Sequence, residues 1–459
     1  MDDAIAFGTD GWRATLDVFT TPRVRAVAQA TADHLADVER AGETVAVGYD
    51  ARPTSRDFAE EIADVLAANG HDVVLPERDC PTPLVAHAIV ERDLAGALVV
   101  TASHNPPEYN GVKFIPADGA PALPHVTEAI EAHLRPPVAD PDAERGDVAE
   151  VDLVTPHAEH CRDLVDADLD GLSVVYDAMH GSGRGVTDRL LEAAGADVER
   201  LRCERDAEFG GTPPDPDDAN LQGLALAVQE HDADLGIAND GDADRIAVVT
   251  PERGFLDENR FFAATYDYLL ETRSGPAVRT VSTSSLVDRV AEAHGEDVYE
   301  TAVGFKWIAE EMKERDALMG GEESGGFSVR GHVREKDGVL MALVAAAAAA
   351  AESYDERAAR LAAEHGDVVQ SKVSVDCPDD RKAAVVRELA DALPETVAGV
   401  NVAGVNDADG FKVRLADDSW LLVRPSGTEP KMRVYAEADS DERVRELLDA
   451  GRDLVEPLV

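Results

Sequence analysis

The sequence is poor in cysteine and in long apolar runs, and each shortage excludes a class of protein. Its four cysteines lie far apart and form no CxxC pair: Cys80, Cys161, Cys203 and Cys377. This argues against a disulfide framework or a zinc site, and we expect buried thiols. No run of about 18 apolar residues could span a membrane, and the N-terminus has no basic start followed by an apolar stretch. We expect a cytoplasmic protein without a membrane partner.

Positive charge is also scarce. The 459 residues include 43 Lys and Arg against 92 Asp and Glu, a formal net charge of −49. Because a phosphate backbone would be repelled, we expect no nucleic-acid partner. The acidic residues are spread along the whole chain, which favours a halophilic protein whose self-repulsion is screened by salt; a merely acidic surface is the alternative. In such a chain, acidic clusters are weak evidence of a site and basic clusters are stronger evidence.

A strand–helix–strand–helix–strand pattern occurs three times, over residues 43–104, 172–240 and 277–326. It predicts parallel strands with crossover helices. After Gly366 the pattern changes to that of an α+β region with an antiparallel sheet, and connectors near 135–147 and 251–254 separate the units. We therefore predict three similar α/β domains with mixed, mostly parallel sheets and a C-terminal α+β domain, with the boundaries 1–145, 146–250, 251–365 and 366–459.

The stretch TASHNPPEYNGVKF, residues 101–114, follows an apolar strand and is rich in turn residues. It is predicted to be a loop at the carboxyl end of a strand, where open α/β sheets bind their ligands. A serine that accepts phosphate needs exposure, a neighbouring proton carrier and a counter-charge. For Ser103, His104 and Lys113 could supply the last two. On this local chemistry alone, an ordinary turn with an unremarkable serine remains the alternative.

The stretch NDGDADR, residues 239–245, also follows an apolar strand and carries three alternate aspartates: Asp240, Asp242 and Asp244. Three converging carboxylates suit a hard divalent ion such as Mg²⁺. A second triplet in VDADLDG has the same spacing: Asp166, Asp168 and Asp170. It comes close to a calcium-loop pattern, but the strand-like LSVVYD after it argues against an EF-hand. Spacing alone leaves the choice between the triplets open.

Two further turns contain polar side chains that could contact a sugar. In GGEESGG, Glu322 and Ser324 could bond vicinal hydroxyls beside backbone that glycine leaves open, although a flexible acidic turn is the alternative. In HVREKDG, Lys336 is one of the few lysines and could act as a general acid or base. A surface salt bridge with Glu335 or Asp337 is the more usual outcome for such a lysine.

The stretch RPSGTEPKMR, residues 424–433, gathers basic and hydroxyl side chains in one turn of an acidic chain. Guanidinium forks with hydroxyls and free turn amides predict a phosphate-binding loop. Two nucleotide signatures are missing. HGSGRGV, residues 180–186, lacks the GxGxxG spacing of a dinucleotide loop, and no GxxxxGK[ST] run suggests nucleotide hydrolysis.

In this order and at these separations, TASHNP, DGDADR, GEESGG and RPSGTEPKMR resemble the α-D-phosphohexomutase superfamily of phosphoglucomutases and phosphomannomutases. The resemblance covers essentially the whole chain, beginning with FGTDGWR at Phe7. It implies four domains around a central cleft. Three similar α/β domains each contribute one loop, and a mobile fourth domain contributes the phosphate-binding loop.

The resemblance also implies a role for individual residues. Ser103 corresponds to the phosphoserine and, with Asp240, Asp242 and Asp244, to the ligands of one magnesium ion per chain. The reacting phosphate is lined by Arg13, His104, Lys113 and Arg245, of which Arg13 and His104 are catalytic candidates. The sugar is contacted by Gly304, Glu322 and Ser324, and the other phosphate by Arg424, Ser426, Gly427, Thr428 and Arg433. Lys336 resembles a lysine proposed for acid/base work in glucose-type members.

The activity that the resemblance implies is the interconversion of hexose 1-phosphate and hexose 6-phosphate, with glucose or mannose as the sugar. It would proceed through a phosphoserine and a bisphosphorylated sugar, which also serves as activator. Phosphoglucosamine mutation is the alternative. Two more distant alternatives are an aspartyl phosphatase and a non-catalytic protein that binds sugar phosphates. We expect a small-molecule sugar phosphate as partner and a monomer or weak homo-oligomer.

Overall fold

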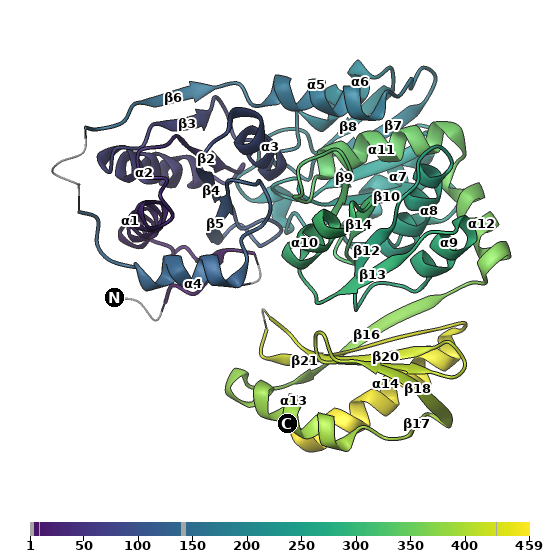
Figure 1. Ribbon diagram of the computed structural model, residues 1–459. Coiled ribbons are helices and arrows are strands. Elements are labelled where there is room, and N and C mark those ends of the chain that lie inside the picture. Colours follow the sequence, from purple (N-terminus) through teal and green to yellow (C-terminus); the bar gives the residue numbers. More distant parts are fainter. Residues whose placement is uncertain (1–3, 9, 139–143, 428) are drawn as a thin grey trace. The chain divides into compact units, whose positions relative to one another are not determined.

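The computed structural model describes residues 4–8, 10–138, 144–427 and 429–459 (Figure 1). The chain divides into two units. The first unit comprises Met1–Phe261 and Ser324–Asp355, and the second comprises Phe262–Glu323 and Glu356–Val459. The first unit contains the first two copies of the predicted repeat.

The first sheet of unit 1 has the strand order β1-β5-β4-β2-β3-β6. Its elements are β1 (Trp12–Thr15), α1 (Thr21–Asp37), β2 (Val45–Tyr49), α2 (Ser55–Ala68), β3 (Val73–Pro76), α3 (Thr82–Arg92), β4 (Gly96–Val100), β5 (Tyr109–Pro116), α4 (Pro124–Ala132) and β6 (Val148–Val151). Strand β2 pairs in parallel with β3 and β4, whereas β5 is antiparallel to β4 and β1. Helices α1 and α2 lie on one face of the sheet and α3 on the other (Figure 1), so β2 and β4 are buried along their whole length.

The second sheet of unit 1 has the order β11-β10-β9-β7-β8. Its elements are α5 (Val154–Val165), β7 (Ser173–Asp177), α6 (Thr187–Ala193), β8 (Asp197–Leu201), a short 3₁₀ turn (Phe209–Gly211), α7 (Gln222–Glu230), β9 (Leu235–Asn239), β10 (Ile246–Thr250) and β11 (Gly254–Leu256). Strand β7 is parallel to β8 and β9, and β10 is antiparallel to β9. The stretch 251–254 is the turn between the paired strands β10 and β11.

Unit 2 contains the third copy of the repeat and the C-terminal sheet. The repeat elements are α8 (Glu258–Leu270), which begins in unit 1, β12 (Ala277–Thr280), α9 (Leu286–His294), β13 (Val298–Thr301), α10 (Phe305–Arg315) and β14 (Met319–Gly321). Strand β12 is parallel to both β13 and β14. The chain then returns to unit 1 as β15 (Phe327–Val329) and α11 (Gly338–Ala351), and α12 (Tyr354–His365) leads back.

The C-terminal sheet has the order β16-β21-β20-β19-β18-β17. Its elements are β16 (Val369–Asp376), α13 (Asp379–Ala392), β17 (Thr396–Val397), β18 (Val400–Asn406), β19 (Phe411–Leu415), β20 (Trp420–Pro425), β21 (Lys431–Ala438), α14 (Asp441–Val455) and a 3₁₀ turn (Glu456–Leu458). Neighbouring strands are antiparallel throughout. Helices α13 and α14 cover one face (Figure 1), which confirms the predicted α+β region.

The three copies of the repeat share one strand order, in which the third strand neighbours the first and the first neighbours the second. The orders are β4-β2-β3, β9-β7-β8 and β14-β12-β13. In each copy a predicted site loop leaves the carboxyl end of the third strand: residues 101–108 after β4, 240–245 after β9 and 322–326 after β14. The repeat therefore gives these three loops equivalent positions.

The alanine-rich helix α11 begins after Asp337 because the Asp337 side chain caps it. The Asp337 side chain accepts a hydrogen bond of 2.7 Å from the backbone N–H of Leu340. The helix is buried as far as Ala348 and packs against α5, α6, β9 and β10, an approach that its small side chains permit. Among the described residues, no single helix is long and apolar enough to cross a membrane. Helices α11 and α12 reach that length only as a pair, bent by 77°.

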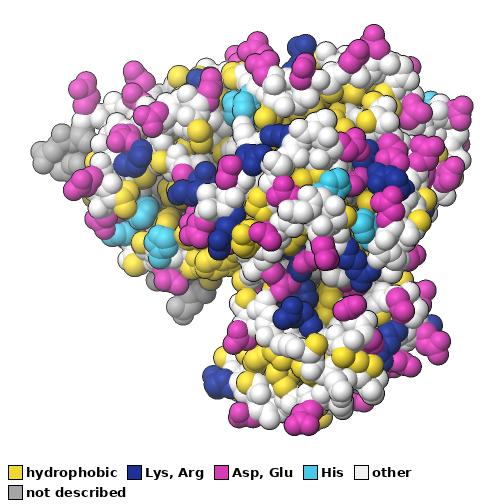
Figure 2. Space-filling view, turned by 45° about the vertical axis from the view of Figure 1, so that its right-hand side comes forward, with side chains coloured by type: hydrophobic (Ala, Val, Ile, Leu, Met, Phe, Trp, Pro, Cys, Tyr) yellow, Lys and Arg dark blue, Asp and Glu magenta, His cyan; other side chains and the backbone are white. Residues whose placement is uncertain are grey.

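The surface reflects the acidic composition. On the face shown in Figure 2, Asp and Glu side chains are scattered over the whole surface rather than gathered in one patch. All four cysteines are free; Cys80, Cys161 and Cys377 are buried and Cys203 is half-buried.

Candidate active site

The backbone of the Ser103 loop is held by a buried arginine that the sequence analysis did not single out. The Arg52 guanidinium donates to the carbonyl oxygens of Ser103 at 2.8 Å and of Asn105 at 2.6 Å, and it pairs with Asp50 at 3.1 Å. Ser103 N–H donates to Thr101 Oγ1 at 2.8 Å. Ser103 itself has a φ of +48°, a left-handed conformation that costs a non-glycine residue about 1 kcal/mol or more. The loop therefore fixes Ser103 in a strained backbone conformation.

The Ser103 side chain faces the second copy of the repeat. Its Oγ donates to Asp240 Oδ2 at 2.6 Å and lies 3.3 Å from His104 Nδ1. Gly241 makes this approach possible, since a Cβ there would lie only 2.5 Å from the Ser103 carbonyl oxygen. The expected exposure of Ser103 is wrong. The residue is 1% exposed, because the neighbouring loop covers its hydroxyl.

Asp240, Asp242 and Asp244 converge at the end of β9. All three are buried, and one oxygen from each lies within 4.8 Å of the others. Thr82 at the start of α3 donates to Asp242 Oδ2 at 2.6 Å. The Oδ1 atoms of Asp242 and Asp244 accept no hydrogen bond, although buried carboxylate oxygens are normally bonded. These uncommitted oxygens fit a hard divalent cation.

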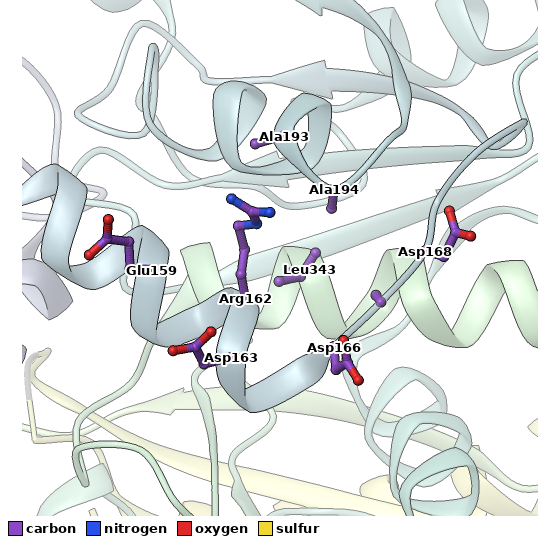
Figure 3. A pocket seen from close by; sticks show the side chains of 9 residues that line it. Glu159, Arg162, Asp163, Asp166, Asp168, Ala193, Ala194 and Leu343 are labelled. Atoms are coloured by element: carbon purple, nitrogen blue, oxygen red, sulfur yellow. The ribbon is translucent and has the colours of Figure 1, made fainter.

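The competing triplet is built differently. Asp166, Asp168 and Asp170 are exposed, and Asp166 ends α5 in a left-handed conformation. Asp166 and Asp168 line a pocket of about 550 Å³ whose other charged side chains include Arg162 and Asp163 (Figure 3). In the described part of the chain, these three carboxylates do not form a converging ligand group, whereas those after β9 do.

Four basic side chains, Lys113, Lys336, Arg13 and Arg245, lie around the three buried aspartates and Asp10. Lys113 Nζ and Lys336 Nζ each lie 3.2 Å from Asp244 Oδ2. Both ammonium groups also reach Asp10, at 3.4 and 3.2 Å, and Arg13 pairs with Asp10 at 3.2 Å. Arg245 donates its backbone N–H to Asp240 Oδ1 at 3.2 Å. Asp10, which the sequence analysis missed, stands beside Arg13 in the quoted FGTDGWR motif and thus links three of the cations.

The charges of these groups determine which protons they can move. Burial alone would lower the pKa of Lys336, but Asp10 and Asp244 outweigh it and raise that pKa above its ordinary value. The Arg245 charge, together with burial, lowers the pKa of His104 to about 2, so this imidazole is neutral. Burial and the neighbouring carboxylates raise the pKa of Asp240. Lys336 is therefore a charged donor, whereas His104 is neutral and a weak base.

The predicted sugar-binding residues are divided between the two units. In unit 2, Gly304 starts α10 with a φ of +118°, and Glu322 is buried directly after β14. Its neighbour Glu323 accepts a hydrogen bond of 3.2 Å from Thr280. Ser324 belongs to unit 1. The roles of Gly304, Glu322 and Ser324 remain predictions.

The predicted phosphate-binding loop lies in unit 2 between β20 and β21. Arg424 Nε donates to Asp409 at 2.8 Å, and Arg433 and Lys431 both pair with Glu429. Lys382 of α13, which the sequence analysis missed, donates to the carbonyl oxygens of Ser426 at 2.7 Å and Glu429 at 2.5 Å. Gly427 is exposed, and Thr428 lies outside the described residues. Each arginine of the loop thus has a carboxylate partner on the surface of the same unit.

Family models match nearly the whole chain. They describe the four domains of phosphoglucomutase/phosphomannomutase: α/β/α domain I matches residues 4–137, domain II 155–254, domain III 257–366 and the C-terminal domain 373–454.

Three relatives match this chain over almost the full length of both proteins. A protein of Methanopyrus kandleri named as a phosphoglucosamine mutase is 35% identical over 98% of this chain and 97% of its own. A phosphoglucomutase/phosphomannomutase of Thermococcus kodakarensis is 32% identical over 98% of each chain, and a phosphopentomutase of the same organism is 31% identical over 99% and 98%.

Solved structures agree. A protein of Thermus thermophilus described as a phosphomannomutase has 33% identity and a TM-score of 0.85, covering 99% of this chain and 100% of its own. A complex of Aspergillus fumigatus N-acetylphosphoglucosamine mutase with GlcNAc-6P and magnesium shares the fold at 15% identity, with a TM-score of 0.60 over 98% and 96%. The chain belongs to the phosphoglucomutase/phosphomannomutase family of the α-D-phosphohexomutase superfamily, whose enzymes are isomerases that act as intramolecular phosphotransferases.

Proposed function

We propose that this enzyme interconverts the 1-phosphate and the 6-phosphate of glucose or mannose through a phosphorylated Ser103 and a bisphosphorylated sugar. The observation that carries the proposal is the 2.6 Å contact between Ser103 Oγ and Asp240 in a buried site. It joins the candidate nucleophile to a carboxylate group with uncommitted oxygens and four surrounding cations. This combination suits transfer of a phosphoryl group and the charge that develops on it.

The Ser103 oxygen and the sugar exchange the phosphoryl group in two half-reactions. First, a sugar hydroxyl attacks the phosphorus: its oxygen forms a new P–O bond, the bond to Ser103 Oγ breaks, and the hydroxyl proton passes to the released Ser103 oxygen. Then the bisphosphorylated sugar presents its other phosphate, and Ser103 attacks in the reverse sense. Magnesium, held by oxygens of Asp240, Asp242 and Asp244, would neutralise charge on the transferring group.

We assign the proton on the sugar oxygen to Lys336. Its ammonium lies 3.2 Å from Asp244 and from Asp10, which keep it protonated. As a charged donor it can give a proton to the sugar oxygen when that oxygen leaves phosphorus, and it regains a proton from the Ser103 hydroxyl that attacks in the same half-reaction. Arg13, Lys113 and Arg245 supply charge for the reacting phosphate, and His104, which lies 3.3 Å from Ser103 Oγ, is a neutral hydrogen-bonding neighbour of the serine.

We assign the phosphate that is not reacting to Arg424, Ser426, Gly427, Thr428 and Arg433. Because the bisphosphate has to present either end, this loop should recognise phosphate itself rather than one end of the sugar. Arg424 and Arg433 already hold carboxylates of Asp409 and Glu429, anions whose place a phosphate group could take. Gly304, Glu322 and Ser324 are assigned to the sugar hydroxyls.

Labelled phosphate tests the nucleophile. Enzyme incubated with glucose 1,6-bisphosphate carrying ³²P should yield a labelled peptide that contains Ser103. Label on a peptide that contains Asp240, Asp242 or Asp244 would instead make the enzyme an aspartyl phosphatase and overturn the proposal.

The choice of sugar needs a separate measurement. The Methanopyrus relative gives phosphoglucosamine specific support as the second candidate substrate. Values of kcat/KM for glucose, mannose and glucosamine 1-phosphates, compared side by side, decide between them. Because the net charge of −49 favours a protein adapted to high salt, the assays should be run in molar KCl. The same solutions, passed through a sizing column, test the proposed monomer or weak homo-oligomer.

A further inference from the structure

A second group of metal-ligating side chains lies in unit 1, outside the candidate active site. Of the 13 histidines in the chain, four pack together: His87 of α3, His157 and His160 of α5, and His332 of the segment before α11. Neighbouring ring centres are 4.8 Å to 6.1 Å apart. Among the described residues, His157, His332 and Asp337 form one of two groups whose ligand atoms converge. The other is the aspartate triplet after β9.

Helix α5 presents two different faces. His157, His160 and Cys161 have the spacing of one helix face, and Cys161 Sγ lies 3.6 Å from His157 Nδ1. Arg162 and Asp163 line the pocket of Figure 3 instead. The histidine cluster is therefore separate from that exposed acidic pocket.

The two oxygens of Asp337 have separate partners. Oδ1 caps α11 through the Leu340 N–H, while Oδ2 accepts hydrogen bonds from Nε2 of His157 at 2.6 Å and of His332 at 2.8 Å. All three of these side chains are fully buried. Two imidazole nitrogens and a carboxylate oxygen within 4.8 Å of one another form a donor set that zinc prefers and magnesium does not.

Hydrogen bonding alone does not satisfy this cluster. The buried Nε2 of His160 and Nδ1 of His332 have no hydrogen-bond partner. Leaving a buried polar atom unpaired costs about 1–3 kcal/mol, so two such atoms in one cluster need an explanation. The neutral imidazole ring is the form that binds metal ions.

We propose that His157, His332 and Asp337 bind one transition-metal ion of the Zn²⁺ class, in addition to the magnesium ion expected at the active site. His160, whose ring centre is 5.1 Å from that of His332, is the imidazole that we assign to the fourth coordination position of the ion. The ion has a structural role. It ties α5 to the segment that carries Lys336, which directly precedes Asp337 in the chain, and so positions that lysine.

Metal binding to the full chain, without any sugar, tests the inference separately from the proposed function. The protein is stripped with chelator and then titrated with Co²⁺, a coloured substitute for Zn²⁺, in a large excess of Mg²⁺ that occupies the aspartate site. We expect one bound Co²⁺ per chain. His157→Gln and His332→Gln should each weaken its binding roughly tenfold or more. The matched control is His133→Gln, which removes another histidine paired with an aspartate, Asp37, at 3.0 Å.

The control and Asp242→Asn should both retain the Co²⁺. The inference is overturned if the parent binds no Co²⁺ under excess magnesium, if both cluster variants bind it like the parent, or if only Asp242→Asn loses it. Because the cluster variants could fail to fold, the parent loaded with zinc is also examined by X-ray absorption at the zinc edge. Imidazole scattering from at least two rings is expected, and an all-oxygen shell would equally overturn the assignment.

Discussion

Two regions of this chain gather basic side chains that we assign to phosphate, and they hold those side chains in different ways. In unit 1, Lys113 and Lys336 are buried, and each shares Asp10 and Asp244. In unit 2, Arg424 and Arg433 are partly exposed, and each has one carboxylate partner in the same unit. The first arrangement fixes the charges before substrate arrives, as electrostatic catalysis requires. The second leaves charges whose partners phosphate can replace, which suits binding and release.

The largest expected effect concerns the buried site of unit 1. Ser103→Ala removes the oxygen that carries the phosphoryl group, and kcat should fall by roughly 10⁴-fold or more. Substrate binding, measured by calorimetry, should change little because the unit 2 cations are untouched. A kcat equal to that of the parent would show that the buried site does not carry phosphate on Ser103.

The next largest effect tests the metal group of the same site. Asp242→Asn removes the negative charge of one of the three converging carboxylates. The Oδ1 atom of Asp242 accepts no hydrogen bond, so it is free to bind the ion. The magnesium concentration for half-maximal activity should rise by roughly two orders of magnitude. Asp168→Asn, a matched change in the exposed triplet, should leave it unaltered. The opposite pattern in the two magnesium titrations would mean that the wrong triplet is assigned.

A smaller effect is expected in the loop of unit 2 that contains Arg424 and Arg433. Arg424→Ala removes one charge-assisted contact to phosphate, worth about 1.5–3 kcal/mol, so KM should rise about ten- to a hundredfold. The variant should also release the bisphosphate more often, and added glucose 1,6-bisphosphate should restore part of the lost rate. An unchanged KM with no new need for bisphosphate would contradict the role assigned to residues 424–433.

The smallest effect concerns stability in unit 2. Glu300 of β13 accepts hydrogen bonds from Lys412 at 2.6 Å and from Arg279. Burial alone would raise its pKa, but Arg279 and Lys412 lower it to about 2. Since the ordinary value is 4.5, this stabilisation is complete above pH 4.5 and is lost as the pH falls towards 2.

Glu300→Gln should therefore lower the free energy of unfolding by about 1–2 kcal/mol at pH 7 and flatten its decline in acid. Urea titrations at pH 7, 4.5 and 3 measure both changes, and the exposed Glu292→Gln serves as control. If the parent and Glu300→Gln lost stability in parallel between pH 4.5 and 3, the charge of Glu300 would not be what joins β13 to β19.

The sequence predicted the long periodic elements well because their burial follows a regular pattern. The strand–helix alternation of all three copies is present. The antiparallel C-terminal sheet is present as well. Antiparallel strands such as β1 and β10 were not predicted, because short strands beside turns lack such a pattern. Strand β6 pairs with β3, a long-range choice that no local pattern reveals.

The candidate site was predictable only where residues lie together in the chain. Alternate spacing could not distinguish Asp240 from Asp168, since the difference lies in burial. Asp10, Arg52 and Lys382 act through partners distant in sequence and carry no spacing signal. The argument from cysteine spacing against a zinc site also could not reveal the histidine cluster, because its ligands come from segments about 180 residues apart.

Because the three loops occupy the same place in their repeats, substrate preference is free to change separately from phosphoryl transfer. Each loop leaves one strand and enters the next, β4 to β5, β9 to β10 or β14 to β15, so its residues can vary while the flanking strands stay in place. With the sugar contacts that we propose for 322–326, selection acting there would retune the choice of sugar without rebuilding 101–108 or 240–245. Relatives of similar length carry names for glucosamine, glucose or mannose, and pentose phosphates, the variety that such separable loops would allow.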